Sequence, residues 1–204
     1  MAIQTQTQAY YVNTVNQNPP RRFKGGPEQP LFVEGTSQSW GIGDFIYQNG
    51  TSNLQICTVN GSSQMTSQVG GQAKTKAVGT AGTLTHFYII RPDDEFVMNV
   101  YHGTPASAIT ALTQIGTARA LVRINGLWMV DIENAVEGSA NALARVLITD
   151  IPPLVNAAGG VNAVGDQYGF VKVSFLPVSI ALTGTTAGRA HWTIRQVMPW
   201  MRVK

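Results

Sequence analysis

Residues 120–132 read Ala-Leu-Val-Arg-Ile-Asn-Gly-Leu-Trp-Met-Val-Asp-Ile, and this stretch decides the fold. Two runs rich in aliphatic residues flank the dipeptide Asn125-Gly126. Asn-Gly tolerates the positive backbone φ that a two-residue type I′ turn requires, and this turn matches the twist of antiparallel strands. The stretch therefore predicts a β-hairpin, which is the strongest hairpin signal in the chain.

Similar short apolar or alternating runs lie on both sides of the hairpin, and Asn49-Gly50 and Asn60-Gly61 lie at the ends of two of them. Glycine is frequent, with 21 residues in a chain of 204, and many Ser and Thr residues separate the runs. This pattern is typical of short strands joined by tight turns. Further strands are expected at residues 44–50, 53–59, 84–90, 95–101, 144–149, 169–177 and 191–197.

Helical patterns are weak, and the best of them spans Pro105–Gly116. Ile109, Leu112 and Ile115 are spaced by three, proline suits the first helical position, and glycine suits the end. We expect an all-β or mainly β protein, an antiparallel β-barrel or sandwich with at most one or two short helices.

The first 30 residues differ in composition from the rest. They are rich in Gln, Asn and Thr and contain Pro19-Pro20, Gly25-Gly26, Pro27 and Pro30. Proline fixes φ and removes a hydrogen-bond donor, so this segment is suited to an extended N-terminal arm rather than to a core. A frayed terminus is the alternative interpretation.

The chain is expected to divide into the arm at residues 1–30, a first β unit at 31–103 and a second β unit at 104–204. The boundary between the two units is placed near Gly103-Thr104-Pro105. One continuous β domain over both units is the alternative.

Charged residues make up 12% of the chain, which is about half of the usual 25%. Much of the surface is therefore expected to face other protein. The charge is also segregated: residues 1–27 carry +3, residues 28–166 carry −5 and residues 167–204 carry +5. Basic ends on an acidic body favour docking onto an acidic partner.

Residues suited to catalysis or metal binding are few. The single cysteine, Cys57, excludes an intramolecular disulfide and lies in an apolar strand pattern, as a small core residue does. The three histidines share no ligand spacing. Asp131 and Glu133 alternate along one strand and form a possible carboxylate pair, but no partner accompanies them. We therefore expect no enzyme, no catalytic residue, no metal and no cofactor.

Candidate contact residues come from the two ends of the chain. Trp, Met and Arg are residues that anchor protein interfaces, and the last seven residues combine all three. A last strand returning to the core is the alternative for that segment. Trp40 and Trp128 are expected in the core. The contact candidates are Tyr10, Tyr11, Arg21, Arg22, Lys24, Trp200 and Arg202.

Several glycine-punctuated strands resemble those of tailed-bacteriophage virion proteins. The resemblance lies in Gly43–Tyr47, Leu54–Cys57 and Val69–Ala73, and in Phe87–Phe96 followed by Gly165–Val173. On these residues the chain resembles a phage head decoration (cement) protein.

This resemblance implies a non-enzymatic protein on the capsid exterior of a virion. Its expected partners are the major capsid protein, whose neighbouring subunits it would clamp, and further copies of itself in a homotrimer. No membrane partner is expected, because no apolar run approaches the ~20 residues that span a bilayer. No direct nucleic-acid contact is expected either. The alternatives are another virion component, such as a tail or adaptor protein, and a carbohydrate- or receptor-binding β module.

Overall fold

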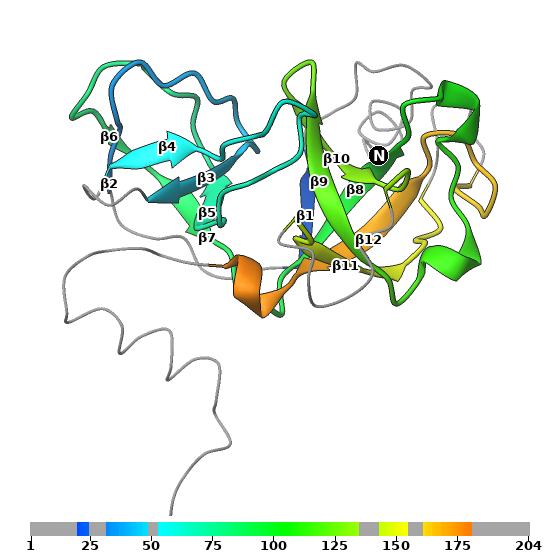
Figure 1. The fold of residues 1–204 in the computed structure, drawn as a ribbon. Coiled ribbons are helices and arrows are strands. Elements are labelled where there is room, and N and C mark those ends of the chain that lie inside the picture. The colour runs from blue at the N-terminus through cyan, green and yellow to red at the C-terminus, as the bar shows by residue number, and fades with distance from the viewer. Residues whose placement is uncertain (1–19, 25–31, 49–52, 135–142, 155–160, 181–204) are drawn as a thin grey trace, which may run out of the picture.

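The computed structural model describes residues 20–24, 32–48, 53–134, 143–154 and 161–180. These residues form a mainly β structure that contains a closed five-stranded barrel and an antiparallel sheet, so the expected fold class is confirmed (Figure 1). Within the described ranges the helical segments are three 3₁₀ turns of three residues each: η1 (Pro105–Ser107), η2 (Leu112–Gln114) and η3 (Pro177–Ser179).

The barrel is organised around β8 (Glu95–Tyr101). One edge of β8 pairs antiparallel with β12 (Phe170–Phe175), and the other edge pairs parallel with β10 (Leu127–Asp131). β9 (Ala118–Ile124) and β11 (Val146–Asp150) complete the ring in the order β8-β10-β9-β11-β12. The β8–β12 pairing closes the ring and leaves these five strands without an open end.

The predicted hairpin is present as β9 and β10. The strands pair antiparallel, with Ile124 opposite Leu127 next to the turn. Asn125 and Gly126 have φ values of 49° and 82°, as a type I′ turn requires. The turn chemistry in the sequence therefore fixes both the hairpin and its register.

The second sheet contains four antiparallel strands. Its order is β4 (Leu54–Ile56), β3 (Phe45–Gln48), β5 (Gly71–Ala73) and β7 (Phe87–Ile89), and β2 (Phe32–Val33) pairs separately with β6 (Leu84–Thr85). β5 has a glycine where a side chain would not fit, because a Cβ atom on Gly71 would lie 2.3 Å from the Phe87 ring.

Phe45 connects this sheet to the barrel. Its ring makes edge-to-face contacts with Phe96 and Phe175 at centroid distances of 5.6 and 5.0 Å, and lies 6.0 Å from the ring of Trp128. All four side chains belong to the larger buried cluster, while Trp40 belongs to the smaller one. The expected burial of both tryptophans is confirmed, and one core spans sheet and barrel.

A strand also forms within the segment predicted as an arm. β1 (Arg21–Lys24) pairs antiparallel with β8, and Arg21 lies opposite Val97. β12 pairs with these same β8 residues along the opposite edge, so β1 lies on the edge of β8 that also pairs with β10. The barrel thus takes strands from both sides of Gly103, and the division into an arm and two β units stays a prediction.

The expectation of one helix over Pro105–Gly116 is wrong. The segment contains only η1 and η2, because Thr110 between them is buried and bonded to another loop. Its backbone N–H donates to the carbonyl oxygen of Asp166 at 3.2 Å, and its Oγ1 donates to that of Ala163 at 2.7 Å. These tertiary bonds replace the local bonds that a continuous helix would need.

The turn geometry predicts different costs for two glycine substitutions. Gly126→Ala places a side chain at a φ of 82° and is expected to lower the free energy of unfolding by about 1–2 kcal/mol. Gly61→Ala is the matched control, since Gly61 also follows an Asn but lies outside the positive-φ region and has open space around it. Urea unfolding of both variants measures the difference, and equal stabilities would contradict this account of the hairpin turn.

Candidate interaction surface

Two loops expose aliphatic side chains at one end of the barrel. They are residues 102–117, which contain η1 and η2, and residues 161–169, and Figure 1 places them at the end opposite the four-stranded sheet. Five of their side chains are between 38% and 65% exposed. Clustered exposed aliphatic residues mark protein contact sites on soluble proteins. We call these five residues the barrel-end surface: Ile109, Leu112, Ile115, Val161 and Val164.

The two loops are bonded to each other. Besides the Thr110 Oγ1 bond, the backbone N–H of Gly165 donates to the carbonyl oxygen of Thr110 at 2.7 Å. Ile109 forms a β-bridge with Gln167, whose side-chain amide donates to the carbonyl oxygen of Pro105 at 2.8 Å. The backbone segments that carry Ile109 and Val164 are therefore held side by side.

The loop at 161–169 is also anchored to the barrel. Asn162 is buried, and its Nδ2 donates to the carbonyl oxygens of Pro152 and Phe170 at 2.8 and 3.1 Å. Its Oδ1 accepts a bond from the backbone N–H of Phe170 at 2.8 Å. One amide side chain thus uses both of its ends to hold the base of the loop in place.

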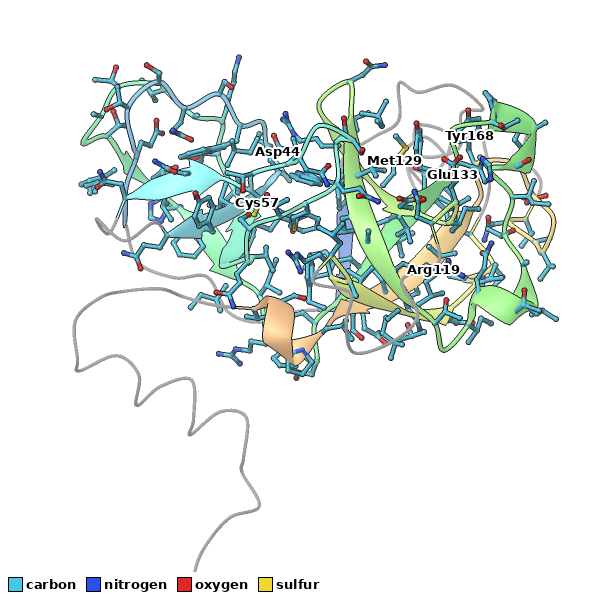
Figure 2. The ribbon with its side chains drawn as sticks, in the orientation of Figure 1. Asp44, Cys57, Arg119, Met129, Glu133 and Tyr168 are labelled. Atoms are coloured by element: carbon cyan, nitrogen blue, oxygen red, sulfur yellow. The ribbon has the colours of Figure 1, made fainter. Side chains whose placement is uncertain are left out.

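Tyr168 stores backbone strain in the same loop. Its φ is 49°, in the left-handed region that costs a side-chain-bearing residue about 1–2 kcal/mol. Its backbone N–H donates to the carbonyl oxygen of Ala108 at 2.6 Å, and its own carbonyl oxygen accepts from Asn99 Nδ2 at 2.6 Å. Figure 2 shows Tyr168 at this end of the barrel. These two bonds hold the backbone in its strained conformation, so the loop is already ordered before any partner binds.

Charge is nearly absent from these loops. Among Asp, Glu, Lys, Arg and His, residues 102–117 contain only His102, and residues 161–169 contain only Asp166. Its carboxylate accepts a bond from the backbone N–H of Ala163 at 2.8 Å and so holds the turn. The barrel-end surface therefore offers a partner aliphatic and neutral polar groups.

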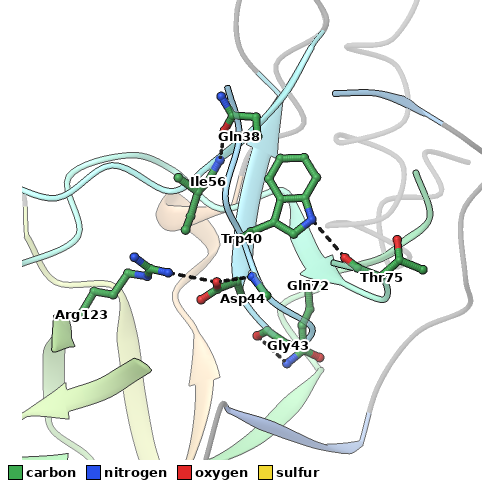
Figure 3. A network of polar contacts seen from close by, with 9 residues as sticks. Gln38, Trp40, Gly43, Asp44, Ile56, Gln72, Thr75 and Arg123 are labelled. Atoms are coloured by element: carbon green, nitrogen blue, oxygen red, sulfur yellow. Dashed lines mark hydrogen bonds and ion pairs between the residues drawn. The ribbon is translucent and has the colours of Figure 1, made fainter. Parts of the chain in front are cut away.

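An ion pair links the barrel to the four-stranded sheet (Figure 3). Arg123 Nη2 lies 3.0 Å from Asp44 Oδ2, which also accepts from the backbone N–H of Gly41 at 2.8 Å. The Arg123 guanidinium carbon lies 5.9 Å from the centroid of the Trp128 ring. Asp44 is buried, so the pair acts as a structural connection between β9 and the start of β3.

Asp131 and Glu133, the possible carboxylate pair, accept hydrogen bonds from the loops around them. Asp131 is buried, and its Oδ2 accepts from Gln64 Nε2 and Asn134 Nδ2 at 2.9 and 3.0 Å. Glu133 Oε2 accepts from the backbone N–H of Gly103 at 2.9 Å. Burial, with the nearby charges of Glu133 and Asp131, raises the pKa of Tyr101.

In the part of the chain that the structure describes, no three His, Cys, Asp or Glu side chains gather as metal ligands would.

Cys57 is a core residue, as expected. It is buried in the larger cluster, and its Sγ lies 3.6 Å from the carbonyl oxygen of Gln68 (Figure 2). Burial raises the pKa of its thiol to about 12, mainly because a thiolate would lose its hydration. A thiol that stays protonated is neither a nucleophile nor a metal ligand at neutral pH.

The structure does not test the contact residues expected from the sequence. Tyr10, Tyr11, Trp200 and Arg202 lie outside the described residues, while Arg21, Arg22 and Lys24 form β1. Their role in contacts stays a prediction. The barrel-end surface was not predicted, because the spacing of Ile109, Leu112 and Ile115 was interpreted as a helical pattern. Their spacing was the available signal, but only the tertiary bonds of Thr110 reveal that these side chains face outward.

No protein-family model matches the chain, and a search of the curated proteins finds no match. The resemblance to phage decoration proteins therefore stays a prediction. Across the described ranges, no helix has the length and apolar character needed to cross a membrane.

The raised pKa of Cys57 predicts a pH dependence of stability. The folded state keeps its proton up to a pH of about 12, whereas the unfolded thiol loses it near 9.0. The contribution is fully present below pH 9 and is lost as pH rises toward 12, since the folded state then binds more protons than the unfolded state. Stability above pH 9 should therefore fall less steeply in Cys57→Ala, which is measured by urea unfolding along a pH series.

A thiol reagent provides the control. Cys57 should react with Ellman's reagent at pH 8 only after denaturant is added, because the side chain is buried. Rapid labelling of the folded chain, or parallel pH profiles for the two proteins, would contradict this description of the site.

Proposed function

We propose that the protein is a non-enzymatic structural component of a phage virion, which binds the outer surface of the capsid and clamps neighbouring major-capsid subunits. The observation that carries this proposal is the barrel-end surface, a rigid, charge-poor aliphatic surface on a closed barrel. Such a surface suits contact with folded protein. Nucleic acid would require clustered Lys and Arg, which these loops lack.

The pre-organisation of the loops supports a binding role. A surface that is already ordered loses little conformational freedom on association, so more of the contact free energy remains as affinity. The bonds of Thr110 and Asn162 hold the loops in this way, and so do the bonds that fix the strained backbone of Tyr168.

Stabilisation of a capsid would follow from mass action. A protein that binds only the assembled lattice stabilises it by about 2.7 kcal/mol per site when its free concentration is 100 times its dissociation constant. Many symmetric copies multiply this effect. No catalytic machinery is required for it.

The charge distribution supports the same role. The basic residues at 1–27 and 167–204, which flank an acidic body, would steer the protein toward an acidic partner. Part of the first basic segment, Arg21–Lys24, has its backbone fixed on the barrel through β8. Electrostatic steering of this kind acts mainly on the association rate and weakens as salt rises.

Cosedimentation tests the proposal. The full chain should bind empty capsids of the phage that encodes it, saturate at a fixed ratio to the major capsid protein, and raise the capsid's melting temperature. Raising the salt concentration should slow association by screening the basic segments. A folded chain that does not bind these capsids would reject the proposal in favour of a tail, adaptor or receptor-binding role.

A further inference from the structure

We infer that Asn125 is a site of spontaneous deamidation in the folded protein, and that the asparagine of a second Asn-Gly pair, Asn60, is protected from the same reaction. The inference concerns a covalent modification of the chain and does not depend on the proposed function. It rests on the different ways in which the structure holds the two side chains.

The reaction needs only water. The backbone nitrogen of Gly126 gives up its proton and attacks Cγ of Asn125, and a C–N bond forms while the Cγ–Nδ2 bond breaks and ammonia leaves with the proton. Glycine favours this attack because no side chain shields its nitrogen. Water then opens the resulting five-membered ring. Opening at Cγ yields aspartate and opening at the main-chain carbonyl yields isoaspartate, with no oxidation or reduction.

Asn125 is open to this reaction. It lies at the exposed tip of the β9–β10 hairpin, where Figure 1 shows the turn projecting from the barrel. Gly126 is exposed too, and the nearest atom to a Cβ position on it is Arg123 Nη2 at 3.9 Å. Within the described part of the chain, the Asn125 carboxamide makes no hydrogen bond. No side-chain bond therefore opposes the rotation that brings Cγ to the glycine nitrogen.

Asn60 is held by its own loop. Its Oδ1 accepts hydrogen bonds from the backbone N–H groups of Ser62 and Gln64, both at 3.0 Å, and its Nδ2 donates to Gln64 Oε1 at 3.3 Å. Gln64 is buried and donates in turn to Asp131 at 2.9 Å. The Asn60 carboxamide must break its bonds before Cγ can turn toward the nitrogen of Gly61, and each broken bond slows the reaction.

The sequence around the two pairs does not separate them. Both asparagines precede glycine, and a Cβ atom on Gly61 would have nothing within 4 Å, so its nitrogen is also open. The difference lies in the bonds of the asparagine side chains. The third pair, Asn49-Gly50, lies outside the described residues.

Deamidation would alter the turn that fixes the hairpin. Isoaspartate adds one atom to the main chain of a two-residue loop, and the length of such a loop sets the register of its strands. Either product also adds a negative charge close to Arg123, which bonds to Asp44. The modification would therefore act beside the ion pair that joins the barrel to the four-stranded sheet.

Peptide mapping by mass spectrometry measures the reaction at each site. The full folded chain is incubated at pH 8, and the loss of ammonia is followed over time at Asn125 and Asn60. We expect conversion at Asn125 to be on the order of 10-fold faster or more, because the bonds of Asn60 must break first. Equal rates in the folded chain, or faster conversion at Asn60, would overturn the inference.

The same chain unfolded in concentrated urea is the matched control. Unfolding removes the bonds of Asn60, so the two rates should approach each other. A difference of the same size in urea would show that the neighbouring residues, Ser62 and Leu127 among them, set the rates. That result would also overturn the inference, since the fold would then have no part in the selectivity.

Two variants test the assignment through the charge of the product. Asn125→Gln removes the side chain that forms the five-membered ring, and Asn60→Gln makes the same change at the protected site. Ion-exchange chromatography of incubated samples should show the acidic form assigned to residue 125 in the wild type and in Asn60→Gln, and not in Asn125→Gln. An acidic form of equal amount in Asn125→Gln would contradict the assignment, and circular dichroism checks that both variants are folded.

Thermal melting tests the effect on the turn. The isoaspartate form, separated from the unmodified wild type, should melt at a lower temperature because its loop no longer matches the register of β9 and β10. Equal melting temperatures would contradict the expected effect on the hairpin.

Discussion

The packing of Phe45 into the barrel is the contact on which the rest of the structure depends. The residue belongs to the four-stranded sheet, yet its ring packs against Phe96 and Phe175, which lie on opposite sides of the β8–β12 closure. Each edge-to-face aromatic pair contributes about 0.5–1.5 kcal/mol beyond the burial of its area. The preceding residue, Asp44, pairs with Arg123 of β9. Two consecutive residues therefore fix the sheet on the barrel, one by apolar packing and one by charge.

Barrel closure explains how strained loops are tolerated. A closed ring leaves its five strands without an open end, and its strands hold the bases of the loops firmly. The left-handed backbone of Tyr168 is fixed by Asn99, a buried residue of β8, and its loop by Asn162 beside β12. The stability of the barrel thus offsets the backbone strain in a loop that carries part of the barrel-end surface.

The features predicted from the sequence are those with local causes. The hairpin at 120–132 follows from Asn125-Gly126, and β8 from a run of apolar residues with defined ends. A feature that depends on a distant partner was not found: β1 forms because β8 has a free edge beside β10. The barrel-end surface belongs to this second kind. Its residues were visible, but Thr110 finds its partner 53 positions along the chain.

The apolar barrel end and the basic segments at 1–27 and 167–204 would affect different steps of binding, because their interactions act over different distances. Aliphatic contacts act only at contact distance and depend little on salt, so they set how long a complex lasts. Charges act over about 8–10 Å at physiological salt and set how fast partners meet. A virion component with both features would therefore meet its partner quickly and stay bound for long.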